Sequence, residues 1–171
     1  MPRPQSDNLS VPVVFKKTGF FGKVALILAT WFGSGLSPVT PGTTGTLAGI
    51  PLILIVGCLG PRVSAVSLAV LIAVSIWASH RTEALLGRKD PGEVVIDEVA
   101  GFLVTMFLLP LSWLTVVLGF LLFRLFDVMK PWPIRQAERL NSGLGIVADD
   151  LLAGLYSHLA LRIILLAIPP D

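Results

Sequence analysis

The stretch that decides the fold is residues 63–79, VSAVSLAVLIAVSIWAS, and a second run of the same kind, LLAGLYSHLALRIILLAI, occupies residues 151–168. An α-helix needs about 20 apolar residues to cross a bilayer, and both runs approach that length. None of the apolar runs keeps the alternation of apolar and polar residues that marks a half-buried strand. The shorter runs cover residues 24–32, 47–60, 99–109 and 111–123. The sequence therefore predicts an all-α fold.

The composition indicates a single membrane-embedded domain. Of 171 residues, 54% are hydrophobic and 14% are charged, whereas about 25% are charged in an ordinary soluble domain. A net charge of +2 leaves no basic surface for nucleic acid. The single cysteine, Cys58, excludes a disulfide framework, and we expect it to be buried because it lies in an apolar run.

The first residues differ from the rest of the chain. Residues 1–23 are polar, with three prolines and the lysines Lys16, Lys17 and Lys23. We expect them to form a flexible lead-in, and residues 24–168 to form the one helical domain.

Basic residues indicate which loops remain in the cytoplasm. We expect residues 47–79 and 99–123 each to form a hairpin through the membrane, residues 151–168 to cross once, and residues 24–32 to dip in without crossing. Pro110 then falls at the outer tip of the second hairpin, where a helix must break. The basic residues on which this topology depends are Arg81, Arg88, Lys89, Arg124, Lys130, Arg135 and Arg139.

Five carboxylates lie inside or beside the apolar runs: Asp97, Glu98, Asp127, Asp149 and Asp150. A charged side chain in lipid costs several kcal/mol unless it is paired or bound to a metal, so such residues indicate function. The simpler explanation for any one of them is a salt bridge, or a place in the first turn of a helix, where the helix dipole favours an acid. Acids at three separate sites, two of them doubled, favour a shared functional site.

Cations accompany one of these acids. Arg124, Asp127 and Lys130 are spaced three residues apart on one helical stripe. Pro131 ends that helix, and Arg135 begins the next segment. Carboxylates without a His or Cys cluster suit a hard cation, Mg²⁺ above all, and the cations around it suit phosphate.

Residues 33–51, GSGLSPVTPGTTGTLAGIP, form a loop that opens a helix. Backbone N–H groups bared by glycine at a helix start can bind phosphate. The hydroxyls that could add donors are Ser34, Ser37, Thr43, Thr44 and Thr46. The P-loop lysine is missing, and a tight turn between packed helices explains the loop equally well.

Four blocks follow one another along the chain: GSGLSPVTPGTTGTL at residues 33–47, Asp97-Glu98, FRLFDVMKPWPIR at 123–135 and GLGIVADD at 143–150. Over residues 31–157 they resemble the phosphatidylglycerophosphatase A family of bacterial lipid phosphatases, and the block at 123–135 is the most specific. The resemblance implies Mg²⁺-dependent hydrolysis of phosphatidylglycerophosphate to phosphatidylglycerol and inorganic phosphate. It also implies a helical bundle around one central helix, for which the apolar runs predict about five to six helices. The enzyme would lie in the bacterial cytoplasmic (inner) membrane as a multi-pass protein, with its active site on the cytoplasmic side.

The resemblance also assigns roles to residues. The acids Asp97, Glu98, Asp127, Asp149 and Asp150 become Mg²⁺ ligands or the base that orients water. Lys130 joins them as a catalytic residue. The phosphate of the lipid substrate would be bound by Arg124, Lys130, Arg135, Ser34, Thr43 and Thr44. Direct attack by water and a covalent phosphoenzyme are both compatible with this set, and direct attack is preferred.

A small membrane cation transporter or channel subunit is the alternative, because intramembrane carboxylates and broken helices also serve ion paths. Lys130 and Arg135 argue against it, since they would repel a cation.

Overall fold

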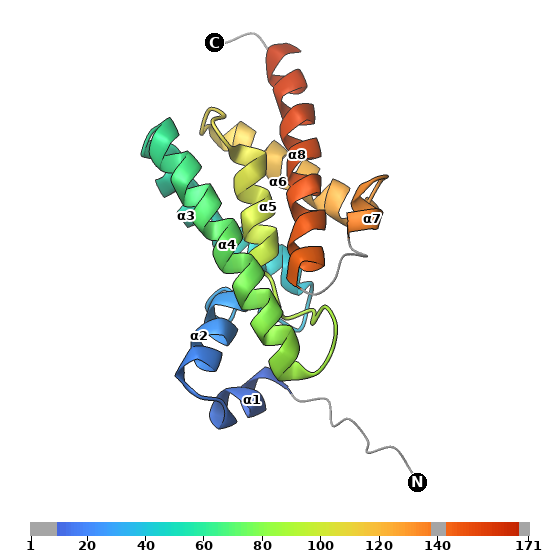
Figure 1. The fold of residues 1–171 in the computed structure, drawn as a ribbon. Helices are drawn as coiled ribbons and strands as arrows, with labels where there is room; N and C mark the ends of the chain where they lie inside the picture. The colour runs from blue at the N-terminus through green and yellow to red at the C-terminus, as the bar shows by residue number, and fades with distance from the viewer. Residues whose placement is uncertain (1–9, 138–142, 168–171) are drawn as a thin grey trace.

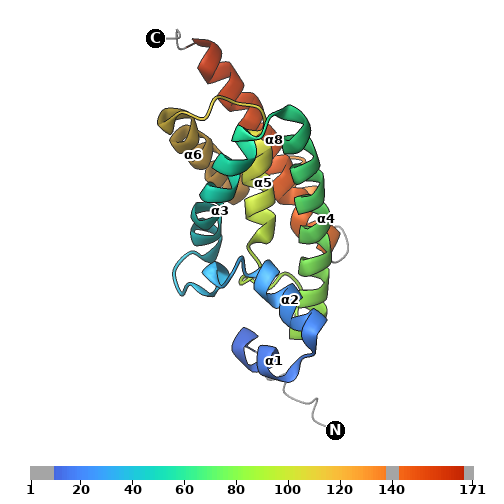
Figure 2. The ribbon, with the colours of Figure 1, turned by 90° about the vertical axis from the view of Figure 1, so that its left-hand side faces the viewer.

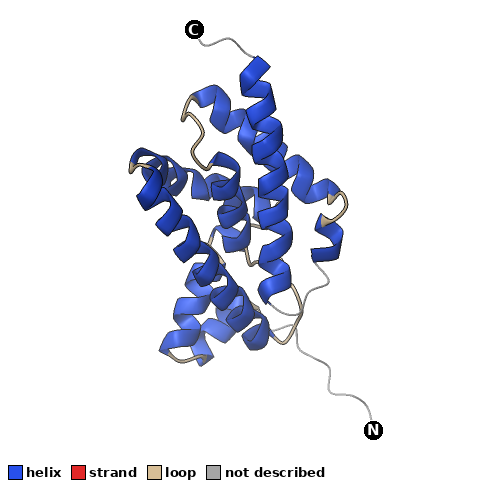
Figure 3. Ribbon diagram, turned by 45° about the horizontal axis from the view of Figure 1, so that its top comes forward, coloured by secondary structure: helices blue, strands red, loops and turns tan. Residues whose placement is uncertain are grey.

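The computed structural model describes residues 10–137 and 143–167, and in these residues it is helical without any strand (Figure 3). This confirms the all-α prediction. The elements, in order, are α1 (Val11–Lys17), α2 (Phe20–Ala29), the 3₁₀ helix η1 (Ser34–Leu36), α3 (Pro41–Cys58), α4 (Pro61–Leu86), α5 (Ile96–Met106), α6 (Trp113–Met129), α7 (Ile134–Ala137) and α8 (Gly143–Ala167). The described residues thus hold eight α-helices rather than the five or six expected, because short helices form outside the long apolar runs.

Helix α5 lies at the centre of the bundle, with α3, α4, α6 and α8 packed around it (Figures 1 and 2). Its backbone approaches α8 very closely, since a Cβ added at Gly154 would lie 2.2 Å from the carbonyl oxygen of Gly101. Glycines Gly45 and Gly49 of α3 likewise pack directly on Val95 and Val99. These contacts bring the first turn of α5 against both α3 and α8.

Among the helices of the described residues, three are long and apolar enough to cross a membrane: α3, α4 and α8. The turn at residues 59–60 joins α3 and α4 as a hairpin, and Pro110 lies in the turn between α5 and α6, as predicted. Cys58, however, is exposed, so the expectation of burial was wrong. A helix that is apolar on every side does not reveal in its sequence which side faces the protein.

The N-terminal segment differs from the expected flexible lead-in over the residues described. Val11 and Val14 of α1 are buried against Leu26 of α2 and Leu86 at the end of α4. An i, i+3 pair of valines gives this short helix an apolar face that packs on its neighbours. Residues 1–9 of the lead-in, and Arg139 of the expected basic cluster, lie outside the described residues.

Candidate active site

A cavity of about 300 Å³ opens where the first turns of α3 and α5, the end of α6 and the early part of α8 meet. It brings together residues from positions 40 to 150 of the chain. Its lining consists of Thr40, Pro41, Gly42, Asp90, Gly92, Val94, Asp97, Glu98, Arg124, Asp127, Lys130, Ile146, Asp149 and Asp150. All five carboxylates singled out in the sequence line it, together with Arg124 and Lys130.

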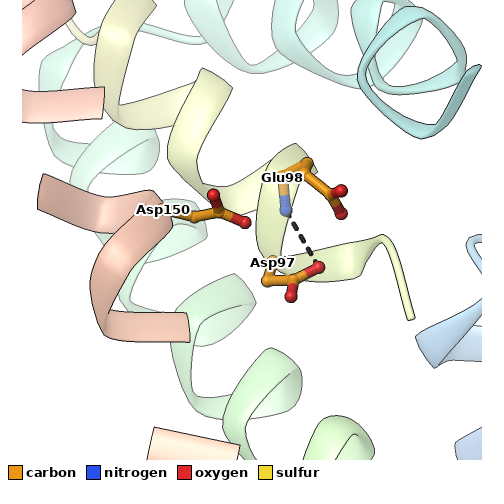
Figure 4. Close-up of side chains that lie close together, drawn as sticks. All are labelled: Asp97, Glu98 and Asp150. Atoms are coloured by element: carbon orange, nitrogen blue, oxygen red, sulfur yellow. Dashed lines mark hydrogen bonds between the residues drawn. The ribbon is translucent and has the colours of Figure 1, made fainter. Parts of the chain in front are cut away.

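Three of these carboxylates form a tight group (Figure 4). Asp97, Glu98 and Asp150 each offer an oxygen, and these oxygens lie within 4.8 Å of one another. Asp97 Oδ1 accepts a hydrogen bond from the Glu98 backbone N–H at 3.1 Å, so the first turn of α5 orients both side chains. Asp150 reaches the group from α8, across the close contact at Gly101 and Gly154.

Asp149 and Asp150 lie well past the first turn of α8, because this helix begins at Gly143. The two residues are also buried. The dipole at a helix start therefore does not account for these acids, whereas Asp149 does form a salt bridge, with Lys130.

Burial disfavours the ionised form of the two acids on α5 and so raises their pKa. Loss of water raises the pKa of Glu98 from 4.5 to about 7, and the nearby Asp127 carboxylate adds to the shift. Burial and the neighbouring Glu98 raise the pKa of Asp97 well above its usual range. A bound cation would lower the pKa of both acids, since it stabilises their ionised form.

The donor atoms fit a hard divalent cation. Within the part of the chain that the structure describes, Glu98 Oε2 and Asp149 Oδ1 are buried without a hydrogen-bond partner. Buried polar atoms are normally satisfied, and carboxylate oxygens are the ligands that Mg²⁺ prefers. The group Asp97, Glu98 and Asp150 can hold such an ion, with Asp149 and Asp127 beside it.

Two basic side chains that line the cavity form ion pairs with its acids. Arg124 Nη1 lies 2.7 Å from Asp127 Oδ2 within α6. Lys130 Nζ donates to Asp149 Oδ2 at 2.6 Å, so it joins the end of α6 to α8. Lys130 caps α6 in the left-handed conformation, with φ 43°, directly before Pro131. The structure therefore keeps two positive charges at the wall of the acidic cavity.

Gly42 lets the start of α3 approach the acids. A Cβ there would lie 2.2 Å from Glu98 Oε1 and 3.1 Å from Arg124 Nη1. The other loop glycines serve packing: a Cβ at Gly35 would lie 2.1 Å from the carbonyl oxygen of Glu93. The sequence suggested either a ligand-binding loop or a tight turn between packed helices. The loop has features of both, because Gly42 lies at the site while the other loop glycines described above lie at helix contacts.

Not every predicted site residue lines the cavity. Arg135 is exposed on α7, and Ser34, Thr43 and Thr44 are also absent from the lining. The hydroxyls of Ser34 and Thr44 donate to backbone carbonyls of preceding residues, Thr30 for the first and Thr40 and Pro41 for the second. The structure therefore does not bring these four residues into the acidic cavity.

Sequence reasoning missed Asp90 and Thr40, which line the cavity. Both have a positive φ, 47° for Asp90 and 44° for Thr40, and both stand in loops. A polar residue in a turn is ordinarily solvated, so composition carries no signal for either. The D-P-G turn at residues 90–92 is the one feature that could have drawn attention to Asp90.

We expect Gly42→Ala to weaken Mg²⁺ binding by about tenfold, as displacement of groups supporting a metal ligand does. The added methyl must push aside the Glu98 carboxylate, while alanine suits a helix better than glycine. The melting temperature in EDTA should therefore be kept, and the Mg²⁺-induced rise in melting temperature should shrink. Gly19→Ala, at an exposed glycine with nothing within 4 Å of the added Cβ, is the matched control. A Gly42→Ala protein with an unchanged Mg²⁺ response would contradict the expected role of this glycine.

Comparison with known proteins gives one consistent family. The model of the family described as phosphatidylglycerophosphatase A matches residues 27–165. Phosphatidylglycerophosphatase A of Escherichia coli K12 is 40% identical over 133 residues, which are 77% of each chain. The Haemophilus influenzae protein of the same name is 39% identical over 134 residues, 77% of this chain and 82% of its own. A Bacteroides thetaiotaomicron protein provisionally named phosphatidylinositol-3-phosphatase is 34% identical over 146 residues, 81% of this chain and 91% of its own. No solved structure matches the chain at a significant level.

Proposed function

The chain belongs to the phosphatidylglycerophosphatase A family and is a phosphatase, and from this premise we propose that it hydrolyses phosphatidylglycerophosphate to phosphatidylglycerol and inorganic phosphate in a Mg²⁺-dependent reaction. The observation that carries the proposal is the group Asp97, Glu98 and Asp150, whose oxygens converge within 4.8 Å in a cavity that also holds Arg124 and Lys130. Family membership also disfavours the alternative of a cation transporter.

The residues of the cavity have different roles in the proposed hydrolysis. Asp97, Glu98 and Asp150 would hold Mg²⁺, which supplies charge neutralisation at the phosphoryl oxygens when bound. Arg124 and Lys130 bind the remaining phosphoryl oxygens, and Asp127 and Asp149 position these two cations. Phosphoryl transfer depends mainly on such positioning and charge stabilisation.

Asp149 is the candidate base for the attacking water. Its Oδ2 binds Lys130, and its Oδ1 is buried and unpartnered among the described residues. The water oxygen bonds to phosphorus, its proton passes to a carboxylate oxygen, and the bond from phosphorus to the glycerol oxygen breaks. The glycerol oxygen takes a proton and leaves as the alcohol of phosphatidylglycerol.

The three long apolar helices indicate a membrane protein, and we propose that it lies in the bacterial cytoplasmic membrane with the cavity facing the cytoplasm. The cavity is lined by residues from the start of α3, the loop after α4 and the early part of α8. The start of α3, the end of α4 and the start of α8 lie toward the same end of the bundle (Figures 1 and 2). Most basic residues described accompany that end, including Arg81, Arg88, Lys89 and Arg135, whereas Arg62 and Arg162 lie toward the other. This bias is typical of the cytoplasmic side.

A second candidate substrate comes from the third relative, whose provisional name points to a phosphatidylinositol phosphate. Both lipids carry a phosphate monoester on a polyol that a phosphodiester joins to diacylglycerol. We propose phosphatidylglycerophosphate for this chain because the two relatives of higher identity bear that name. The test is phosphate release from each lipid in detergent micelles, with Mg²⁺ or with EDTA. Equal release with EDTA would overturn the Mg²⁺ requirement, and no release from either lipid under any metal would overturn the proposed function.

We expect the apparent affinity for Mg²⁺ to rise about tenfold between pH 6 and pH 8, because a ligand with a pKa of about 7 must lose its proton to bind metal. The folded pKa of Glu98 is raised, so its ionisation destabilises the metal-free protein as pH rises from about 4.5 to 7. Melting temperatures measured with EDTA and with a Mg²⁺ series at both pH values check this. An affinity independent of pH would contradict the expectation that a Glu98 carboxyl with a raised pKa binds the metal.

A further inference from the structure

The acidic cavity is one of three neighbouring cavities that share lining residues. The second, of about 510 Å³, shares Pro41 and Gly92 with the acidic cavity. The third, of about 400 Å³, shares Val11, Pro12 and Leu36 with the second. The three cavities are therefore neighbours, lined in turn by the acids, by part of the glycine-rich loop, and by residues of α1 and α2.

The chemistry of the walls changes from one cavity to the next. The acidic cavity is lined by charged groups, whereas the third cavity is lined mainly by apolar residues, among them Phe15, Leu26, Ile27 and Phe32. Between them, the second cavity is lined by one basic and one acidic side chain, Arg88 and Glu93. The walls thus change from mostly acidic, through this ion pair, to mainly apolar.

Arg88 is built into the wall of the second cavity. It follows Gly87, which ends α4 with φ 65°, and its side chain is 39% exposed. Its Nη2 lies 2.5 Å from Glu93 Oε1, while its Nε is buried and has no hydrogen-bond partner among the described residues. Gly35 packs directly on the backbone of Glu93, and both residues line the same cavity. The guanidinium thus keeps an unsatisfied donor beside a polar cavity, and arginine donors suit phosphate oxygens.

Resting on the proposed function, we propose that Arg88 binds the bridging phosphodiester of the lipid substrate. The phosphate monoester lies among the acids, the short polyol passes Pro41 and Gly92, and the phosphodiester reaches Arg88. The site thereby selects lipids that carry a monoester and a phosphodiester separated by a polyol. Phosphatidate, whose only phosphate is attached directly to diacylglycerol, cannot occupy both positions.

The test compares wild type and Arg88→Gln on phosphatidylglycerophosphate and on phosphatidate in mixed micelles of one composition. Loss of one charge-assisted contact should raise KM for phosphatidylglycerophosphate about tenfold, with kcat within about twofold. The slower hydrolysis of phosphatidate should not change. Arg88→Lys should recover part of the loss, since it keeps the charge without the planar fork.

Two variants separate this role from a structural one. Lys89→Gln removes a neighbouring exposed charge that does not line the second cavity, so it should leave both KM values unchanged. If Arg88 acts only by pairing with Glu93, Glu93→Gln will reproduce the rise in KM, and that result would overturn the proposal. Melting temperatures of all four variants identify any that fail to fold, and Arg88→Lys then supplies the measurement.

A water-soluble substrate separates the headgroup from the micelle surface. Deacylated phosphatidylglycerophosphate retains both phosphates, so Arg88→Gln should raise its KM by a similar factor. An effect seen only in anionic micelles would make Arg88 a membrane contact and overturn the subsite. If wild type releases no phosphate from any of these substrates, the proposed function fails; if it does and Arg88→Gln matches wild type, only the subsite fails.

Discussion

Asp150→Asn is expected to lower Mg²⁺-dependent phosphate release by about a thousandfold or more, as loss of a residue central to the reaction does. Asp150 is buried on α8 and supplies one of the three converging oxygens. The amide keeps the shape of the side chain but carries no charge and binds Mg²⁺ weakly. Phosphate release from phosphatidylglycerophosphate in micelles, at saturating Mg²⁺, measures the effect.

The same substitution should leave the metal-free protein at least as stable as wild type. Without a cation, Asp150 faces the like charges of Glu98, Asp127 and Asp149, and Asn removes that repulsion. The expected combination is lost activity, an equal or higher melting temperature in EDTA, and a smaller rise in melting temperature with Mg²⁺. A purely structural role for Asp150 predicts the opposite, namely a lower melting temperature in EDTA. Glu93→Gln, which removes a carboxylate outside the acidic cavity, should keep kcat.

The long helices were predictable because continuous apolar runs leave few alternatives to a helix. The helix ends were less predictable. The last run predicted a helix from residue 151, but α8 begins at Gly143, because local backbone bonding rather than apolarity decides where a helix starts. That difference of two turns moves Asp149 and Asp150 from the start of the helix into its interior. The helix dipole then no longer stabilises their negative charge.

The acids of the site were predictable for a different reason. A carboxylate in an apolar run is costly wherever the run folds, so Asp97, Glu98 and Asp127 stood out without knowledge of the tertiary structure. Asp90 did not, because a charged residue in a turn costs nothing until another element packs against it. Its place in the cavity depends on how the loop after α4 meets α3 and α8.

Four of the six residues predicted to bind phosphate, Arg135, Ser34, Thr43 and Thr44, do not line the acidic cavity. Arg135 follows the proline turn at residues 131–133 in sequence, but α7 places it on the surface. Thr44 bonds back to its own helix, which serine and threonine commonly do and which no sequence spacing reveals. Arg88 showed the reverse: it served only as a topology signal in the sequence, whereas the structure places it in the wall of a cavity.

Lys130→Gln is expected to lower kcat/KM about a hundredfold, the usual loss when one charge-stabilising donor is removed from an active site. Lys130 lines the acidic cavity and binds Asp149 at 2.6 Å. Its ammonium would bind a phosphoryl oxygen of the substrate beside the acids. Arginine at this position should retain part of the activity because it keeps the charge.

The pairing with Asp149 provides the decisive control for Lys130. Lys130→Gln leaves Asp149 buried without its cation, which is destabilising, so a loss of activity could follow from a lower folded fraction. The double variant Lys130→Gln with Asp149→Asn removes both charges and should restore the melting temperature. Because Asp149 is also the candidate base, the double variant is compared with Asp149→Asn alone. If Lys130 binds substrate phosphate, the double variant is much less active than Asp149→Asn. If Lys130 serves only to satisfy Asp149, the two variants have equal residual activity. Melting temperature and phosphate release measured on the same preparations therefore separate the two roles.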